Sequence, residues 1–207
     1  MTEKHLSPEE IVDLFKAAFG DGVKSAEIRG TAEGVKKNTT REVWIRIDRA
    51  LLINAIERLI ELDYPHLGVI SGSDDGEEIE LLYHLFIYYG EHLGETAVIL
   101  GVSLPKSDPT VPTITGLIPG ALTSEREKQE MLGVTVVGIP DSRRIFLPDD
   151  FPVGVHPWRK DDKGIPAEMI KDLSETGRPA YREAHKPVVE PAGEVCEPCE
   201  VEKNGGE

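Results

Sequence analysis

Side chains that could do chemistry are concentrated between residues 125 and 150, in the stretch EREKQEMLGVTVVGIPDSRRIFLPDD. Glu127 and Glu130 are three positions apart in a segment that we predict to be helical, and this spacing places both carboxylates on one face. Two carboxylates can act as a general acid and a general base, but they then need an enclosing pocket and shifted pKa values. A helix that faces solvent or another protein needs neither, and the residues alone favour this second interpretation.

Two adjacent arginines, Arg143 and Arg144, follow the helix on a segment that we predict to be extended. Consecutive side chains of an extended chain point in opposite directions. We therefore expect one guanidinium to bridge back to the glutamate-rich helix and the other to reach a carboxylate of a partner. A stand-alone enzyme built on Glu127, Glu130 and this arginine pair stays open as an alternative.

No established catalytic motif accompanies these residues. The chain contains no G-x-S-x-G elbow and no phosphate-binding G-x-x-x-x-G-K-[ST] or G-x-G-x-x-G sequence. A nucleophilic site would also need a serine, cysteine or lysine beside an activating base. The motifs therefore indicate neither a nucleophilic site nor a phosphate-binding site.

Cys196 and Cys199 form a C-x-x-C pair near the end of the sequence. Their spacing suits zinc or an iron–sulfur cluster, but a closed zinc site needs about four ligands. The nearest histidine, His185, precedes Cys196 by eleven residues, and no second cysteine pair exists. One interpretation is half of a metal site completed by another protein chain, or a redox dithiol. The interpretation that we favour is two thiols in an acidic tail, so no metal site is predicted.

Composition excludes several classes of function. The net charge of −15 argues against nucleic acid as a partner, because phosphate backbones require clustered lysine and arginine. The longest apolar stretch, near LLYHLFIYYG, is shorter than the roughly 20 residues that a transmembrane helix needs. The first ten residues, MTEKHLSPEE, have no apolar signal core. We expect a cytoplasmic protein without direct membrane insertion.

The first 133 residues are predicted to form an α/β body. Ser7, Pro8 and Glu10 carry the pattern of a capped helix start, and Asp48 is expected to cap a second helix with a stripe of Leu52, Ile56, Leu59 and Ile60. Alternating apolar residues predict strands at 23–30, 42–48, 66–74, 78–90 and 95–104. A third helix is expected over 121–132, ended by Gly133. This order favours an α+β fold with a mixed, largely antiparallel sheet and helices on one face.

Proline becomes frequent after residue 104 and recurs every few positions beyond Gly138. Such a segment cannot build a core of its own, because proline fixes the backbone and removes hydrogen-bond donors. We predict three parts: a body over residues 1–133, an extended arm over 134–186 that runs over some surface or is disordered at its end, and an acidic tail over 187–207 that holds the C-x-x-C pair.

Several linked blocks resemble the C-terminal half of the complex I 30-kDa subunit family. They are PTVPTITGLIPGA, EREKQEMLGV and GIPDSRRIFLPDDFPVGVHPWRKD, and LLYHL at 81–85 is similar to a Tyr-His-Leu strand of the same family. Ile139 stands where respiratory members carry histidine, Ser124 where an aromatic residue is usual, and Trp158 where leucine is usual. These differences make the chain more similar to the branch that accompanies a [NiFe]-hydrogenase-like large subunit.

The resemblance implies a non-catalytic structural and assembly subunit in the peripheral electron-transfer arm of a membrane-bound, ion-translocating oxidoreductase. The complex would be of the hydrogenase type or a related sulfur-reducing type, with a quinone-reducing NADH dehydrogenase as the alternative. No cofactor is implied in this chain; iron–sulfur clusters and, for the hydrogenase type, a [NiFe] centre are implied in its partners. These partners would be a hydrogenase-like large subunit, an iron–sulfur small subunit and a ferredoxin-like subunit, on the cytoplasmic side of the cell membrane.

The resemblance also implies that the arm over 134–186 wraps these partner subunits, and it implies which residues contact them. The expected interface residues are Glu125, Arg126, Glu127, Asp141, Arg143, Arg144, His156, Pro157, Trp158 and Arg159.

Overall fold

The computed structural model describes residues 5–33, 38–90, 94–160, 164–166 and 169. Its helices are α1 (Pro8–Phe19), α2 (Leu52–Ile60) and α3 (Leu122–Leu132). Its strands are β1 (Val23–Glu33), β2 (Asn38–Ile47), β3 (His66–Asp74), β4 (Glu78–Ile87), β5 (Thr96–Pro105), β6 (Thr110–Pro112) and β7 (Thr135–Val137). The predicted elements are therefore present, with boundaries that differ by a few residues.

The start of α1 has the predicted capping box. The Ser7 hydroxyl accepts a hydrogen bond from the Glu10 amide at 3.2 Å, and the Glu10 carboxylate accepts one from the Ser7 amide at 2.7 Å. These two bonds satisfy backbone donors that the first turn of a helix leaves without an internal partner. Ile11 and Phe15 then lie fully buried on the inner face of the helix.

Five strands form one sheet in the order β1-β2-β5-β4-β3. The pairs β1–β2, β4–β5 and β3–β4 are antiparallel, whereas β2 and β5 run parallel with Trp44 opposite Ile99. The sheet is thus mixed and largely antiparallel, which confirms the predicted α+β class.

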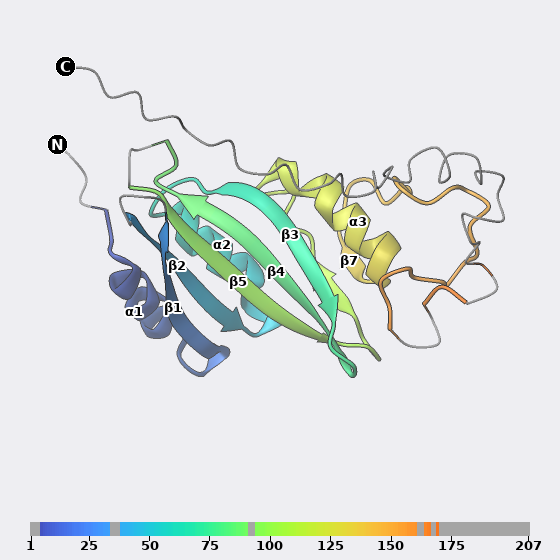
Figure 1. Cartoon of the computed structure of the whole chain (residues 1–207), viewed down its shortest axis with the longest axis horizontal. Helices are drawn as coiled ribbons and strands as arrows, with labels where there is room; N and C mark the ends of the chain where they lie inside the picture. The colour runs from blue at the N-terminus through green and yellow to red at the C-terminus, as the bar shows by residue number, and fades with distance from the viewer. Residues whose placement is uncertain (1–4, 34–37, 91–93, 161–163, 167–168, 170–207) are drawn as a thin grey trace, which may run out of the picture. The chain divides into compact units, whose positions relative to one another are not determined.

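One face of the sheet carries the core. Along β4, Ile79, Leu81, Tyr83, Leu85 and Ile87 are buried while the residues between them are partly exposed, as the two-residue period of a strand requires. The helices α1 and α2 cover this face, and the other face of the sheet points toward the viewer (Figure 1). Helices on one face were expected.

The predicted cap of the second helix is wrong. The Asp48 side chain forms no capping hydrogen bond, and a short 3₁₀ turn over Arg49–Leu51 precedes α2. Asp48 instead forms an ion pair with Lys24, with 3.0 Å between Oδ2 and Nζ. The predicted apolar stripe is confirmed, because Leu52 and Leu59 are fully buried against the sheet.

The strands β6 and β7, which precede and follow α3 in the sequence, pair in parallel as a second, two-stranded sheet. It joins the segments that enter and leave α3, and it was not predicted because strands of three residues have too little pattern to detect. The first compact unit of the chain extends from Met1 through Pro166, so the described residues of the predicted arm up to Pro166 belong to the same unit as the body. The boundaries at 133 and 186 stay predictions, and the tail at 187–207 lies outside the described residues.

Among the residues that the structure describes, no helix combines the length and apolarity needed to span a bilayer.

Candidate docking surface

The first turn of α3 is attached to the chain that leaves β6. The Glu125 carboxylate is buried, with 3% of the residue exposed, and accepts hydrogen bonds from Thr113 Oγ1 at 2.6 Å and the Ile114 amide at 2.7 Å. Burial raises the pKa of Glu125, and these two hydrogen bonds partly oppose that effect. Glu125 therefore holds the base of α3 in place from inside the protein.

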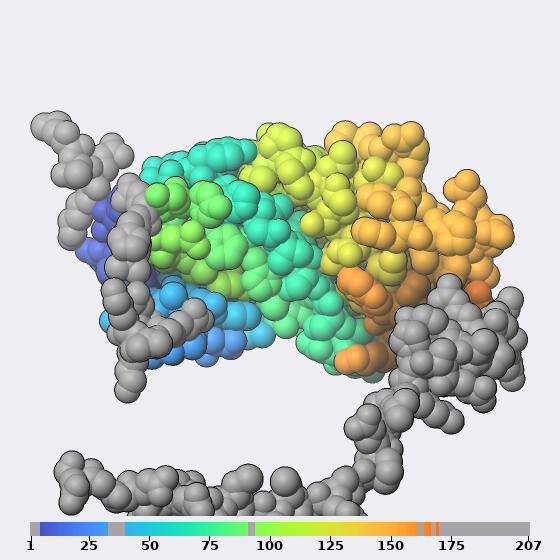
Figure 2. Space-filling view, turned by 45° about the horizontal axis from the view of Figure 1, so that its top comes forward, coloured from blue at the N-terminus to red at the C-terminus, as the bar shows by residue number. Residues whose placement is uncertain are grey.

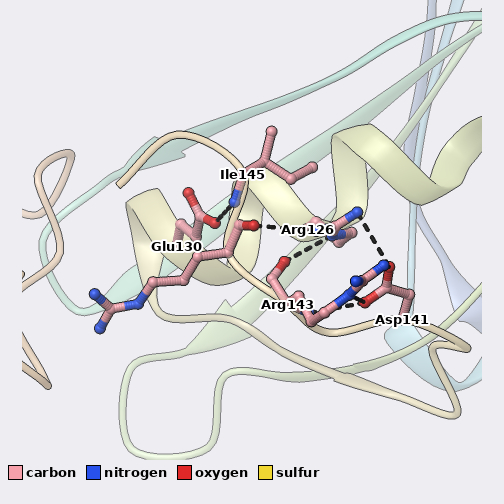
Figure 3. A network of polar contacts seen from close by, with 6 residues as sticks. Arg126, Glu130, Asp141, Arg143 and Ile145 are labelled. Carbon is pink, nitrogen blue, oxygen red and sulfur yellow. Dashed lines mark hydrogen bonds and ion pairs between the residues drawn. The ribbon is translucent and has the colours of Figure 1, made fainter. Parts of the chain in front are cut away.

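Arg126 connects α3 to the segment that follows β7. Its Nε donates to the Arg143 carbonyl at 2.7 Å and its second terminal nitrogen to the Arg144 carbonyl at 3.1 Å. The remaining terminal nitrogen lies 3.3 Å from the carboxylate of Asp141. Figure 3 shows the guanidinium of Arg126 directed at this segment. One side chain thus binds the backbone of both Arg143 and Arg144.

The guanidinium groups of the arginine pair do not make the connection that we expected. Arg143 forms a bidentate contact with Asp141, at 2.9 and 2.7 Å, and its side chain is 84% exposed. The hydrogen bonds from Arg143 hold the pKa of the Asp141 carboxyl well below its usual range. The guanidinium of Arg144 donates to the carbonyls of Pro148 at 2.9 Å and Phe151 at 3.0 Å. The carbonyls of the pair, rather than the guanidiniums, therefore bind α3.

Glu130 binds the backbone of a second part of the same segment. Its carboxylate accepts hydrogen bonds from three consecutive amides: those of Ile145, of Phe146 at 2.9 Å and of Leu147 at 3.2 Å. Figure 3 shows the contact with Ile145. Glu127, the other half of the predicted carboxylate pair, contacts the ammonium of its neighbour Lys128. The carboxylate of Glu130 is engaged in hydrogen bonds with backbone amides, so this geometry does not support a pair of carboxylates that act as acid and base.

The C-terminal end of α3 binds residues 156–159. Gly133 ends the helix in the left-handed conformation, with φ of +66°. The free carbonyls of the last turn are then satisfied from outside the helix, as helix ends require. His156 Nδ1 lies 2.9 Å from the Glu130 carbonyl, the Trp158 amide donates to the Met131 carbonyl at 2.9 Å, and Arg159 Nε donates to the Leu132 carbonyl at 2.5 Å.

Asp74, at the end of β3, secures the far end of this segment. It is 2% exposed and accepts hydrogen bonds from the Lys160 amide at 2.9 Å and the Gly76 amide at 3.0 Å. Lys106 Nζ lies 2.8 Å from its carboxylate. Burial favours the neutral acid, but the hydrogen bonds from Lys106, Lys160 and Gly76 outweigh it and lower the pKa of Asp74 to about 2. Sequence reasoning missed this contact, which joins residues 86 positions apart.

We call residues 138–160 the wrapped segment. In the space-filling view it appears in orange against the yellow surface of α3 (Figure 2). Its backbone is bound by α3, by Asp74 and by the Arg144 side chain of the segment itself, and several of its large apolar side chains are exposed. Of the ten large hydrophobic side chains that are exposed among the described residues, six lie in or beside this segment. These six are Val137, Ile145, Phe146, Val153, Trp158 and Ile165.

The ten predicted interface residues differ in how far they are exposed to solvent. Arg143 and Trp158 are exposed, and Glu125 and Arg159 are buried. The others are partly exposed: Arg126, Glu127, Asp141, Arg144, His156 and Pro157. Their contacts with partners stay predictions. Glu130 was absent from the set, although its spacing from Glu127 and its place in the quoted EREKQEM pattern both drew attention to it.

No group of three or more histidine, cysteine, aspartate or glutamate side chains suited to hold a metal ion occurs in the described part of the chain. Cys196 and Cys199 lie outside the described residues.

Comparison with known proteins identifies the family. Residues 45–167 match the model of the respiratory-chain NADH dehydrogenase 30 Kd subunit. This match covers more than half of the chain. The chain belongs to this family. It is therefore a 30 Kd-type component of a membrane-bound hydrogenase or other complex I-related respiratory complex, and its family carries no cofactor of its own.

Two relatives connect the 30 Kd family with hydrogenases. The chain is 40% identical over 131 residues to membrane-bound hydrogenase subunit beta of Pyrococcus furiosus, a match that covers 63% of this chain and 75% of the relative. It is 32% identical over 156 residues to Hydrogenase-4 component G of Escherichia coli. That match covers 74% of this chain but only 26% of the relative, so the module forms about a quarter of a longer polypeptide there.

A solved structure has the same fold. It is described as the membrane-bound sulfane sulfur reductase, an archaeal respiratory membrane complex. One of its chains superposes with a TM-score of 0.56 and 20% identity, and the match covers 94% of this chain and 98% of that one. At this identity the similarity establishes the fold alone.

Proposed function

We propose that this chain is a non-catalytic structural and assembly subunit in the peripheral arm of a membrane-bound, ion-translocating oxidoreductase of the hydrogenase type. The observation that carries the proposal is the wrapped segment, whose backbone is secured by Arg126, Glu130 and Asp74 while Ile145, Phe146 and Val153 face outward. Exposed apolar groups concentrated in one segment are typical of a surface that another protein covers.

The module's place in Hydrogenase-4 component G supports a particular kind of partner. In that relative, the remaining three quarters of the polypeptide are covalently joined to the module. Segments that are fused in one protein commonly form contacts as separate chains in another. We assign a hydrogenase-like large subunit, the partner that the family resemblance implies, to the wrapped segment, with an iron–sulfur small subunit and a ferredoxin-like subunit in the same assembly.

In this arrangement the redox chemistry belongs to the partners. Iron–sulfur clusters, and a [NiFe] centre where the acceptor is the proton, would be bound by those chains on the cytoplasmic side of the membrane. This chain would contribute a preformed surface: apolar side chains for burial and the exposed guanidinium of Arg143 for charge-assisted bonds. The same role in a sulfur-reducing or quinone-reducing complex would differ in the acceptor and use the same surface.

The test is co-purification from the native membrane with the tagged full chain. Phe146→Ser combined with Val153→Ser removes outward apolar groups without changing the contacts of Glu130 or Arg126. We expect the large subunit recovered with this variant to fall by at least about tenfold, because each buried aromatic or aliphatic anchor contributes roughly 1–3 kcal/mol to an interface and tenfold corresponds to about 1.4 kcal/mol.

The matched control is Ile28→Ser combined with Val69→Ser. These residues are also exposed and apolar, but they lie on β1 and β3 of the main sheet. The control should recover the large subunit as the unmodified chain does. Equal recovery with both double variants would overturn the proposed surface, provided that thermal unfolding shows all proteins to be folded.

A further inference from the structure

A cavity of about 410 Å³ lies away from the wrapped segment, where the connection between α2 and β3 meets the ends of β4 and of the loop before α3. Its walls are formed mainly by rings. Tyr64, His66 and Tyr89 contribute aromatic faces, and Pro65 and Pro119 contribute pyrrolidine rings. Among the described residues that line the cavity, Asp63 is the only acidic one, and none is a lysine or arginine.

The aromatic walls are exposed and yet held in place. Tyr64 is 58% exposed, and its hydroxyl donates to the Leu117 carbonyl at 2.9 Å. Tyr89 is 62% exposed, and its ring stacks on His66 with centroids 4.8 Å apart and an interplanar angle of 21°. The cavity is therefore preformed, which reduces the entropy that a ligand must overcome on binding.

Backbone strain beside the cavity supports a binding role. Tyr88 has φ of +56°, the only positive φ of a non-glycine residue in the described part of the chain. The left-handed region is costly for a bulky side chain, and such residues cluster at functional sites. The Asp63 carboxylate accepts a hydrogen bond from the Tyr88 amide at 2.6 Å and so stabilises this conformation. The consequence is that Tyr88 is buried, whereas the next ring, Tyr89, lines the cavity.

The charge and shape of the lining indicate a planar cation. Aromatic faces attract cations through their quadrupole, and the carboxylate of Asp63 adds a full negative charge. The net charge of the chain, −15, acts in the same direction. A guanidinium stacks on rings and donates several hydrogen bonds in its own plane, whereas an ammonium is a strongly hydrated point charge. A carboxylate can accept several donors, so the bond from Tyr88 leaves capacity for a guest.

We propose that this cavity binds an arginine side chain presented by a partner polypeptide, with the guanidinium stacked on Tyr89 and hydrogen-bonded to Asp63. The proposal adds a second contact site, built from residues outside the wrapped segment. It does not depend on the assignment of the large subunit as a partner.

The test uses the full chain and a defined probe, the peptide acetyl-Gly-Arg-Gly-amide, followed by amide chemical shifts in NMR. The comparison probe contains citrulline, which has nearly the same shape and no charge. We expect saturable shifts confined to the non-proline residues of 63–67, 88–89 and 117–120, and affinity about fivefold lower for the citrulline peptide. Tyr89→Leu should weaken arginine binding by about the same factor, and Tyr89→Phe should preserve it.

Trp158→Leu is the matched control, because it removes an exposed ring from the wrapped segment and should leave peptide affinity unchanged. Equal binding of the citrulline peptide would overturn the proposal, as would shifts spread over acidic residues and insensitive to Tyr89→Leu. Retention of the fold in each variant is read from the remaining amide shifts. Because this assay involves no partner protein, its failure and a failure of the co-purification test are distinguishable.

Discussion

His156 lies directly against Gly133 at the end of α3, so close that a Cβ atom built on this glycine would overlap the imidazole at Nε2. The glycine also has φ of +66°, which side chains disfavour. The absence of a side chain at one residue thus allows the histidine ring to reach the Glu130 carbonyl. The wrapped segment depends on this close approach.

Gly133→Ala should lower the free energy of unfolding by about 2–4 kcal/mol, as the sum of left-handed strain and a steric conflict with His156. Urea unfolding measures this loss. Gly154→Ala is the control, because Gly154 has φ of +83° and no atom within 4 Å of its Cβ position. It should cost only about 1–2 kcal/mol. In a His156→Ala background the two glycine substitutions should become similar, and a persistent difference would show that another contact is responsible.

Glu130→Gln should open the wrapped segment locally. The substitution replaces a charged acceptor of three amides by a neutral one, and hydrogen bonds to charged groups contribute about 1.5–3 kcal/mol. We expect trypsin to cleave after Arg143 and Arg144 about tenfold faster, since cleavage follows the population of the open form. Mass spectrometry of the fragments over time gives the rate at these sites.

Arg126→Gln should have the same effect on trypsin cleavage, because it removes the donors that bind both arginine carbonyls. Glu57→Gln, in an exposed position of α2, is the control and should leave the rate unchanged. If neither Glu130→Gln nor Arg126→Gln accelerates cleavage, the side-chain contacts of α3 are not what closes the segment.

Asp74 should make stability sensitive to acid. Its folded pKa, about 2, lies below that of an unfolded aspartate, about 3.9, so it stabilises the fold above that pH. This contribution declines as the pH falls from about 4 toward 2. Asp74→Asn should therefore reduce stability at pH 7 and flatten its dependence on pH in this window. Its exposed neighbour gives the control Asp75→Asn, which should retain the full acid dependence; an unchanged slope in Asp74→Asn would refute the assignment.

The contribution of Glu125 to the stability of the fold should change with pH in the opposite direction to that of Asp74. Its folded pKa is raised, so the stability that its protonation contributes is fully present below the unfolded pKa and is lost as the pH rises through the folded value. Glu125→Gln removes that loss, and its stability relative to the unmodified chain should improve as the pH increases from about 4 to 7. Urea unfolding at several pH values provides the measurement.

At pH 7, Glu125→Gln should be tolerated, since the amide oxygen can accept from Ile114 and the Thr113 hydroxyl can turn toward Thr115, 2.8 Å away. Glu125→Ala should cost about 1–3 kcal/mol because it leaves buried donors unsatisfied. Equal losses for the two variants would contradict this account of the buried carboxylate.

By itself, the sequence determined the elements whose patterns are local. The capping box of Ser7 and Glu10, the alternation along β4 and the stop at Gly133 each depend on residues a few positions apart, so they could be predicted. The mixed, largely antiparallel sheet follows from the order of those elements. Asp48 was misread as a cap because Lys24, which pairs with it, lies in another element.

Only the tertiary structure decided what the charged motif does. Glu125, Arg126 and Glu130 looked like catalytic or surface groups, but they bind backbone at positions 11 to 18 residues away in segments without periodic structure. The contact of Asp74 with Lys160 spans 86 positions. An unpaired amide in an irregular segment has no side-chain signature, so its acceptor becomes evident only when the folded chain brings the two together.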